Sequence, residues 1–175
     1  MTPNDTIIYH KLIVVFDMCS SSNIIEDLTL TSNIDKLKNI INKLKKWLRI
    51  KSKEYRYEIY KYIGDGWILL FPVDITGNEI INFLKKLNSI YYSTINSTII
   101  PYLERDLETT GLTFGIEKGP LTELIMLGKR EFLGRALNIA FRLQNAAKGK
   151  GGYPDYPILV SNQVYNEYLR EARGL

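Results

Sequence analysis

The sequence predicts a single α/β domain, over residues 1–175, in which helices cover a mixed or antiparallel sheet. A chain of this length can bury a core of its own as one domain. Apolar periodicity gives the order strand, helix, hairpin, helix, hairpin, helix, strand, helix. Because these segments alternate without the regular spacing of strand–helix–strand units, they favour a sandwich whose sheet is not purely parallel.

The first part of the chain predicts a covered strand and a helix. Residues 7–17 form the strand, which is apolar on both faces from Leu12 to Phe16 and ends at Asp17. The next residues, MCSSSN, are polar and turn-forming. An amphipathic helix follows, because apolar residues recur at spacings of three and four. Its predicted stripe consists of Ile34, Leu37, Ile41, Leu44 and Leu48.

A hairpin is predicted at residues 54–71, where EYRYEIYKYIGDGWILLF has a Gly-Asp-Gly turn between two arms. The arm at 55–63 alternates apolar and polar side chains, whereas the arm at 67–71 is continuously apolar. The glycines supply the positive φ that a tight turn needs. The same turn holds the carboxylate of Asp65 near Lys61. Asp65 is therefore either a turn residue alone or a metal ligand together with Asp17.

The second half begins with a helix predicted at about residues 78–95, which Pro101 bounds. Residues 112–127 predict another hairpin, with its turn at residues 117–120. The tail predicts a strand at 156–160 and then a helix capped by Ser161.

The stretch RALNIAFRLQNAAKGK after Gly134 predicts one more helix. Asn138 and Arg142 are four residues apart and share one face, close to the apolar stripe formed by Ala136 and its neighbours. Polar residues normally lie away from such a stripe. This pair indicates either a functional site or a helix at an oligomer interface.

Composition limits the possible environments and partners. The net charge of +4 is mild, and much of it lies in the lysines of the first helix. We interpret that face as solvated and expect no nucleic-acid partner. Cys19 is the single cysteine, which excludes an internal disulfide and fits a reducing compartment. Without a signal peptide or an apolar run of about 20 residues, we expect a cytoplasmic protein with no membrane insertion.

Several stretches together resemble the catalytic domain of class III nucleotidyl cyclases. VVFDMCSSS at 14–22 resembles the family's first-metal motif, and YKYIGDGWILLF at 60–71 resembles its K-x-x-G-D motif. FGIEKGPL at 114–121 and FLGRALNIAFRLQ at 132–144 resemble its G-I-x-x-G-P and G-x-x-x-N-x-A-x-R segments. The order and spacing match over nearly the whole chain. The resemblance implies the cyclase sandwich, with a largely antiparallel central sheet and a ferredoxin-like core.

The resemblance also implies a role for each matching residue. Asp17, Asp65 and the backbone carbonyl of Met18 match the ligands of two Mn²⁺ or Mg²⁺ ions per site. Lys61 and Glu131 match the base-reading positions. Asn138 and Arg142 match the pair that, in the family, orients the ribose and stabilises the transition state. The family assembles each site from two protomers, so the resemblance implies a homodimer with two composite active sites that act on a nucleoside triphosphate.

Within the family, the wording of GDGWILLF and GRALNIAFRLQ most resembles the bacterial Pycsar pyrimidine cyclases. That resemblance implies synthesis of cUMP or cCMP in antiphage defence, with a separate effector that responds to the product. Phe16 and Phe141 would narrow the base pocket if they face it, and otherwise they belong to the core. The alternatives are an adenylate or guanylate cyclase and a catalytically silent nucleotide-binding module.

This chain ends without the C-terminal hairpin that carries a phosphate-binding lysine in longer purine cyclases. Several basic residues are candidates to replace its charge, and the sequence does not choose among them. The candidates are Lys129, Arg130, Arg135, Lys148 and Lys150.

Overall fold

The computed structural model describes residues 7–107, 109–148 and 156–172. The strands are β1 (Ile8–Met18), β2 (Glu58–Ile63), β3 (Gly66–Pro72), β4 (Leu112–Met126), β5 (Lys129–Leu133) and β6 (Ile158–Val160). The helices are α1 (Ser21–Leu30), α2 (Ile34–Tyr55), α3 (Gly77–Thr98), α4 (Arg135–Ala147) and α5 (Asn162–Val164). Short helical turns follow α3 at Ile100–Tyr102 and α5 at Tyr165–Leu169.

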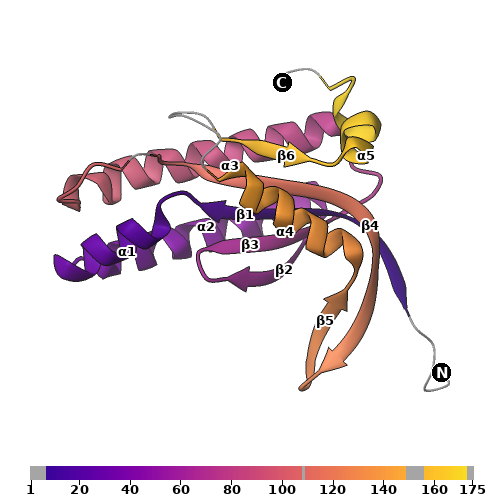
Figure 1. Ribbon diagram of the computed structural model, residues 1–175, viewed down its shortest axis with the longest axis horizontal. Helices are drawn as coiled ribbons and strands as arrows, with labels where there is room; N and C mark the ends of the chain where they lie inside the picture. The colour runs from indigo at the N-terminus through magenta and orange to yellow at the C-terminus, as the bar shows by residue number, and fades with distance from the viewer. Residues whose placement is uncertain (1–6, 108, 149–155, 173–175) are drawn as a thin grey trace.

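These strands form one mixed sheet in the order β2-β3-β1-β4-β5, and β6 pairs with β4. Every pairing is antiparallel except β4 with β6. The long strand β4 pairs with β6 near its start and with β5 near its end, so it bends, and the β4–β5 hairpin projects from the body of the domain (Figure 1). The predicted α/β sandwich with a largely antiparallel sheet is confirmed.

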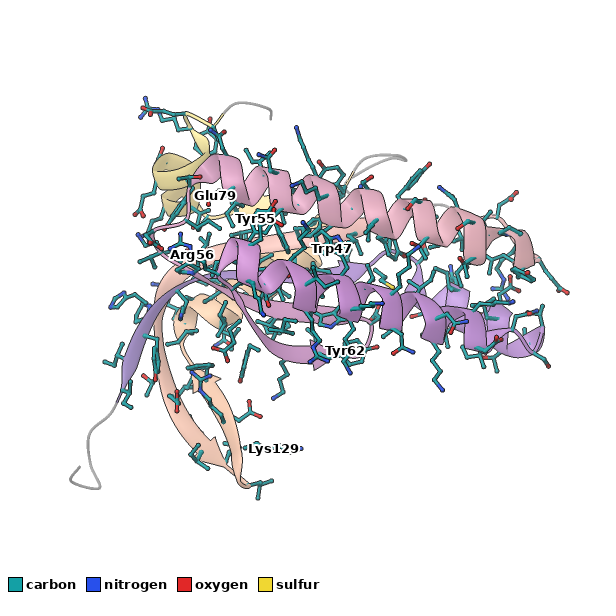
Figure 2. The ribbon with its side chains drawn as sticks, turned by 180° about the vertical axis from the view of Figure 1, so that it is seen from behind. Trp47, Tyr55, Arg56, Tyr62, Glu79 and Lys129 are labelled. Carbon is teal, nitrogen blue, oxygen red and sulfur yellow. The ribbon has the colours of Figure 1, made fainter. Side chains whose placement is uncertain are left out.

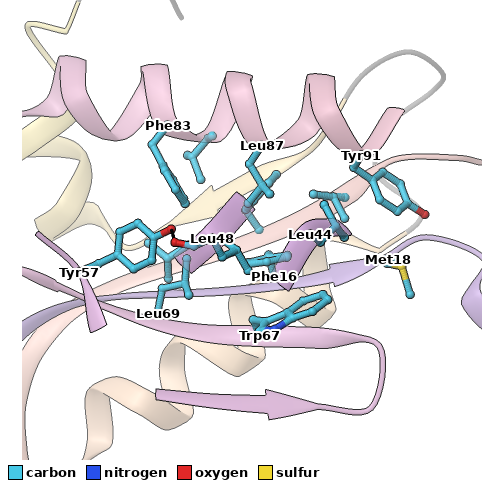
Figure 3. Close-up of a cluster of buried hydrophobic side chains, with 14 of the residues drawn as sticks. Phe16, Met18, Leu44, Leu48, Tyr57, Trp67, Leu69, Phe83, Leu87 and Tyr91 are labelled. Carbon is cyan, nitrogen blue, oxygen red and sulfur yellow. Dashed lines mark hydrogen bonds between the residues drawn. The ribbon is translucent and has the colours of Figure 1, made fainter. Parts of the chain in front are cut away.

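The alternation of side chains along β1 divides the core into two layers. Leu12, Val14 and Phe16 point into the larger layer, which α1, α2 and α3 cover (Figure 3). Ile13 and Val15 point the other way, toward α4 and β5. Successive residues of a strand face opposite sides of a sheet, so β1 contributes to both layers, and all five of these side chains are completely buried. The central position predicted for the first strand is therefore confirmed.

The second hairpin was predicted at the wrong place. Residues 117–120 do not turn but continue β4, where Glu117 pairs with Ile13 and Pro120 with His10. Gly119 is needed for packing, because a Cβ there would lie 2.7 Å from the Cβ of Ala136 in α4. The turn comes instead at Leu127 and Gly128, both with positive φ.

Three other local predictions need correction. The polar stretch after β1 leads directly into α1, which the sequence interpretation left out. Helix α2 continues to Tyr55, so the first arm of the 54–71 hairpin is shorter than predicted. The buried stripe of α2 uses Ile40, whereas Ile34 is 45% exposed. Ends of this kind are set by tertiary packing rather than by local periodicity.

Candidate active site

The close approach of β1 and β3 places Asp65 beside Asp17. Phe16 pairs with Trp67 across the two strands. A Cβ at Gly66 would lie 2.2 Å from the backbone oxygen of Phe16 and 2.9 Å from Oδ1 of Asp17, so only glycine allows this approach. The first glycine of the turn, Gly64, has a φ of +67°. The glycines of the turn therefore serve two purposes: they allow the tight turn, and they allow Asp65 to lie beside Asp17.

The two carboxylates leave buried oxygen atoms without partners. Oδ1 of Asp17 and Oδ2 of Asp65 are buried, and neither has a hydrogen-bond partner among the described residues. Burial raises the pKa of Asp17, and the neighbouring charge of Asp65 raises it further, while Lys148 acts in the opposite direction. Lys148 Nζ lies 2.7 Å from Oδ2 of Asp17. A cation is thus already attracted to this position.

This pair of carboxylates fits a divalent cation. Unpaired buried carboxylate oxygens are costly, and a bound ion satisfies them. Hard oxygen ligands suit Mg²⁺ or Mn²⁺, which proteins commonly hold through one or two carboxylates together with substrate phosphates. Within the described ranges, no group of three or more His, Cys, Asp or Glu gathers at one point. Met18 ends β1 next to Asp17, and its carbonyl stays a predicted ligand.

Lys61 of β2 and Glu131 of β5 form an ion pair. Lys61 Nζ lies 2.8 Å from each carboxylate oxygen of Glu131, which comes from β5. This ion pair lowers the pKa of Glu131 and raises that of Lys61. The two predicted base-reading residues are thus brought together within one chain, although they are 70 residues apart.

Tyr60 belongs to the same cluster and was missed by the sequence interpretation. Its hydroxyl donates a hydrogen bond of 2.6 Å to Glu131 and accepts one of 2.9 Å from the backbone N–H of Phe132. The register of β2 against β3 shifts between Ile59 and Lys61. This irregularity lets the neighbouring residues Tyr60 and Lys61 both reach Glu131. Simple alternation along the strand gives no signal of it.

Asn138 and Arg142 lie on the exposed face of α4. The face toward the sheet consists of small or buried residues, including Ala136, Ala140 and Gln144. The expectation that the polar pair lies close to the buried stripe was therefore wrong. No hydrogen bond or ion pair joins Asn138 or Arg142 to another residue in the described part of the chain. The pair is free to contact a ligand or a second protomer.

The two phenylalanines considered for the base pocket differ in position. Phe16 is completely buried and packs in the larger layer, where it stacks on Trp67 with ring centroids 5.3 Å apart. It does not face a groove, so its size cannot narrow a base pocket. Phe141 is partly buried and packs at the edge of the smaller layer.

The basic residues considered as phosphate-binding candidates differ in their positions and partners. Arg130 is engaged by Glu58 and Glu123, and Lys129 lies at the tip of the β4–β5 hairpin (Figure 2). Lys150 lies outside the described residues. Lys148 alone among the described candidates contacts one of the paired aspartates.

No protein-family model and no curated protein matches the sequence. Solved structures do match the fold. A bacterial light-regulated adenylyl cyclase aligns with a TM-score of 0.70 and 20% identity over 94% of this chain and 46% of its own. The adenylyl cyclase CyaB from P. aeruginosa aligns with a TM-score of 0.68 and 21% identity over 93% of this chain and 82% of its own.

A third match is the guanylyl cyclase domain of the RhoGC fusion protein from the aquatic fungus Blastocladiella emersonii. Its TM-score is 0.65, with 18% identity, and the alignment covers 93% of this chain and 87% of that domain. The chain spans less than half the length of the light-regulated cyclase. These matches agree with the topology described above. The chain therefore has the fold of the class III nucleotidyl cyclase catalytic domain.

Proposed function

We propose that this protein is a metal-dependent nucleotidyl cyclase that converts a ribonucleoside triphosphate to its 3′,5′-cyclic monophosphate and pyrophosphate. The observation that carries the proposal is the meeting of Asp17 and Asp65 with unpaired, buried carboxylate oxygens. It is supported by the cyclase fold and by the Lys61–Glu131 pair.

The chemistry needs few protein groups. Asp17 and Asp65, with the carbonyl of Met18, would hold two Mn²⁺ or Mg²⁺ ions. When bound, such ions activate the attacking 3′-oxygen and neutralise the leaving pyrophosphate. Arg142 offers a planar fork of donors to the charge that develops on the α-phosphate. Asn138 can hold the ribose without adding charge, so positioning and electrostatics supply most of the rate.

We propose that the working form is a homodimer with two composite sites. Asn138 and Arg142 are exposed and make no contact with the aspartates of their own chain in the described residues. The β4–β5 hairpin also exposes Ile125, Met126 and Leu127, with Leu127 97% exposed. Apolar side chains concentrated at a projecting tip are typical of an interface. A second copy of this chain would cover the tip and bring the α4 pair to the carboxylates.

We propose UTP or CTP as the substrate. Lys61 donates and Glu131 accepts hydrogen bonds, and uracil and cytosine each present one acceptor beside one donor on the edge that such a pair reads. Glu131 is one methylene longer than aspartate, and it leaves less room for a second ring. Phe16 lends no support, because it lies in the core. The motif wording adds the proposal that the product is a second messenger of bacterial antiphage defence, read by a separate effector.

An adenylate or guanylate cyclase is the second candidate. The solved structures named above are adenylyl and guanylyl cyclases, and the Lys61–Glu131 pair also matches the donor and acceptor edge of adenine. A silent nucleotide-binding module is the third candidate. It is favoured by the similarity, at 20% identity and a TM-score of 0.66, to a class III adenylyl cyclase-like ATP-binding protein from Pseudomonas aeruginosa.

The direct test is incubation with ATP, GTP, CTP and UTP separately, in the presence of Mn²⁺, followed by identification of the product. We expect a cyclic pyrimidine nucleotide and pyrophosphate from the wild type and from Asp74→Asn, which changes an exposed aspartate. Asp65→Asn should give no product. A purine product would overturn the base assignment. If no product forms at protein concentrations above the dimer dissociation constant, the silent nucleotide-binding module is the remaining candidate.

A further inference from the structure

The loop between β1 and α1 lines a cavity of about 220 Å³. Lys148, which pairs with Asp17, is also part of its lining. The loop is held in place by the segment at residues 109–111. The backbone N–H of Cys19 donates to the carbonyl of Gly111 at 3.0 Å, and Oγ of Ser20 donates to the carbonyl of Thr109 at 2.8 Å. Ser20 has a φ of 54°, which turns the chain sharply into α1. The cavity is therefore formed by fixed backbone.

The groups around this cavity favour an anion. Its lining consists of Met18, Cys19, Ser20, Ser21, Ser22, Asn23, Thr109 and Lys148, and contains no carboxylate. Among the described residues of this lining, Lys148 carries the only full charge. The hydroxyl and amide groups can donate hydrogen bonds to oxygen, and the first N–H groups of a helix such as α1 lack partners within the helix.

Lys148 stands between this cavity and the metal position. It follows the last residue of α4, Ala147, which is completely buried and fixes the end of the helix. Its ammonium lies 2.7 Å from Oδ2 of Asp17, yet its side chain is 49% exposed and can change direction. The ammonium therefore occupies a place where a divalent cation would compete with it for the same oxygen.

We propose that Lys148 is a phosphate-binding residue that exchanges its partner during substrate binding, an inference that rests on the proposed cyclase function. Without metal, Lys148 neutralises Asp17. On binding of the metal complex of a nucleoside triphosphate, Lys148 would release Asp17, which would then hold the divalent cation, and would turn into the adjoining cavity to pair with the phosphate chain. The lysine thus acts from the same protomer as the aspartates.

The exchange predicts two effects of opposite sign when the ammonium is removed. In Lys148→Met, binding of Mn²⁺ alone, followed by electron paramagnetic resonance, should tighten by about threefold or more, because the competing cation is gone. Binding of the manganese complex of inorganic tripolyphosphate, followed by calorimetry, should weaken by about tenfold. Lys148→Arg should keep both wild-type values within about threefold, and Lys38→Met, on the exposed face of α2, should change neither.

These readouts are independent of catalysis. If no triphosphate is cyclised by the wild type, the cyclase proposal fails while the two binding measurements still judge Lys148. Opposite shifts in Lys148→Met support the exchange. Unchanged binding of both probes, or a parallel loss of both in a variant whose circular dichroism spectrum matches the wild type, overturns it. If Lys148→Met does not fold, Lys148→Gln gives the same comparison with a polar side chain.

Discussion

At the scale of single residues, several neighbouring groups shift the pKa of Asp17 in opposite directions. Burial raises its pKa, the carboxylate of Asp65 adds to this effect, and Lys148 counters it only in part. Because the pKa of Asp17 is raised by folding, the folded state binds more protons than the unfolded state between the two pKa values. The stability of the metal-free protein therefore falls as pH rises through that interval.

Asp17→Asn should remove this pH-dependent loss. At neutral pH and without metal, we expect its Tm to rise by roughly 2–4 °C, the shift produced by about 1 kcal/mol in a protein of this size. Thermal unfolding across a pH series measures the effect. Asp74→Asn is the matched control, since pairing with Arg56 lowers the pKa of Asp74 and gives the opposite slope. An Asp17→Asn protein that is less stable than the wild type at neutral pH would refute this electrostatic account.

Glu131 tests the base assignment at the same scale. It accepts hydrogen bonds from both Lys61 and Tyr60, so its removal leaves two donors without their acceptor. We expect Glu131→Ala to lower kcat/KM for the preferred triphosphate by about 10- to 100-fold, corresponding to about 1–3 kcal/mol for a charged hydrogen bond, and to reduce the preference among bases. Glu123→Ala, on the neighbouring strand, is the control. Unchanged preference in Glu131→Ala would show that the base is read elsewhere.

At the scale of elements, the packing of helix α4 depends on Gly115 and Gly119 of β4, and Gly115 is the more closely approached of the two. A Cβ at Gly115 would lie 2.1 Å from the backbone oxygen of Ala140 and 2.3 Å from the backbone nitrogen of Gln144. Neither backbone atom can move away without displacing the helix that presents Asn138 and Arg142.

Gly115→Ala should therefore destabilise the protein by about 2–4 kcal/mol and also lower the cyclase activity that remains. Gly128→Ala is the control, because a Cβ there meets nothing within 4 Å and only the positive φ opposes it. That variant should lose about 1 kcal/mol. Urea denaturation measures both. Equal stability of the two variants would mean that α4 does not pack as tightly on β4 as described.

The same elements show which predictions the sequence supports. The continuous apolar run of β3 and the three-and-four spacing of α2 and α3 are local signals, and they gave the correct elements. The turn predicted at residues 117–120 was wrong, because Gly119 and Pro120 are turn-formers whose role here is set by α4 and β1. Such residues acquire their conformation from distant partners, which a periodicity argument does not include.

The site residues likewise include some that the sequence predicts and some that only the folded structure reveals. Asp17 at the end of its strand and Asp65 in its Gly-Asp-Gly turn near Lys61 carry local signals, and the motif resemblance adds Glu131 and the base-reading roles of Lys61 and Glu131. Tyr60 depends on a strand irregularity, and Lys148 meets Asp17 across 131 residues of sequence. Neither contact leaves a pattern in the neighbouring residues, so only the folded structure shows them.

At the scale of the whole molecule, a single chain carries all the predicted catalytic groups, and among its described residues no hydrogen bond or ion pair links Asn138 or Arg142 to the paired carboxylates. The carboxylates lie at the end of β1 and the turn before β3, and the α4 pair is exposed. No helix within the described ranges is long and apolar enough to cross a bilayer. We propose that the exposed apolar tip of the β4–β5 hairpin contacts a second copy of the chain, so that one protomer completes the site of the other.

Mixing two inactive variants tests this central claim most directly. Asp17→Asn keeps the α4 pair but loses a metal ligand, whereas Arg142→Ala keeps the carboxylates but loses the transition-state donor. After equal amounts exchange subunits, half of the dimers contain one intact composite site, so about a quarter of the wild-type cyclase activity should return. If size-exclusion chromatography shows that both variants fold and dimerise, and the mixture stays inactive, the composite site is contradicted.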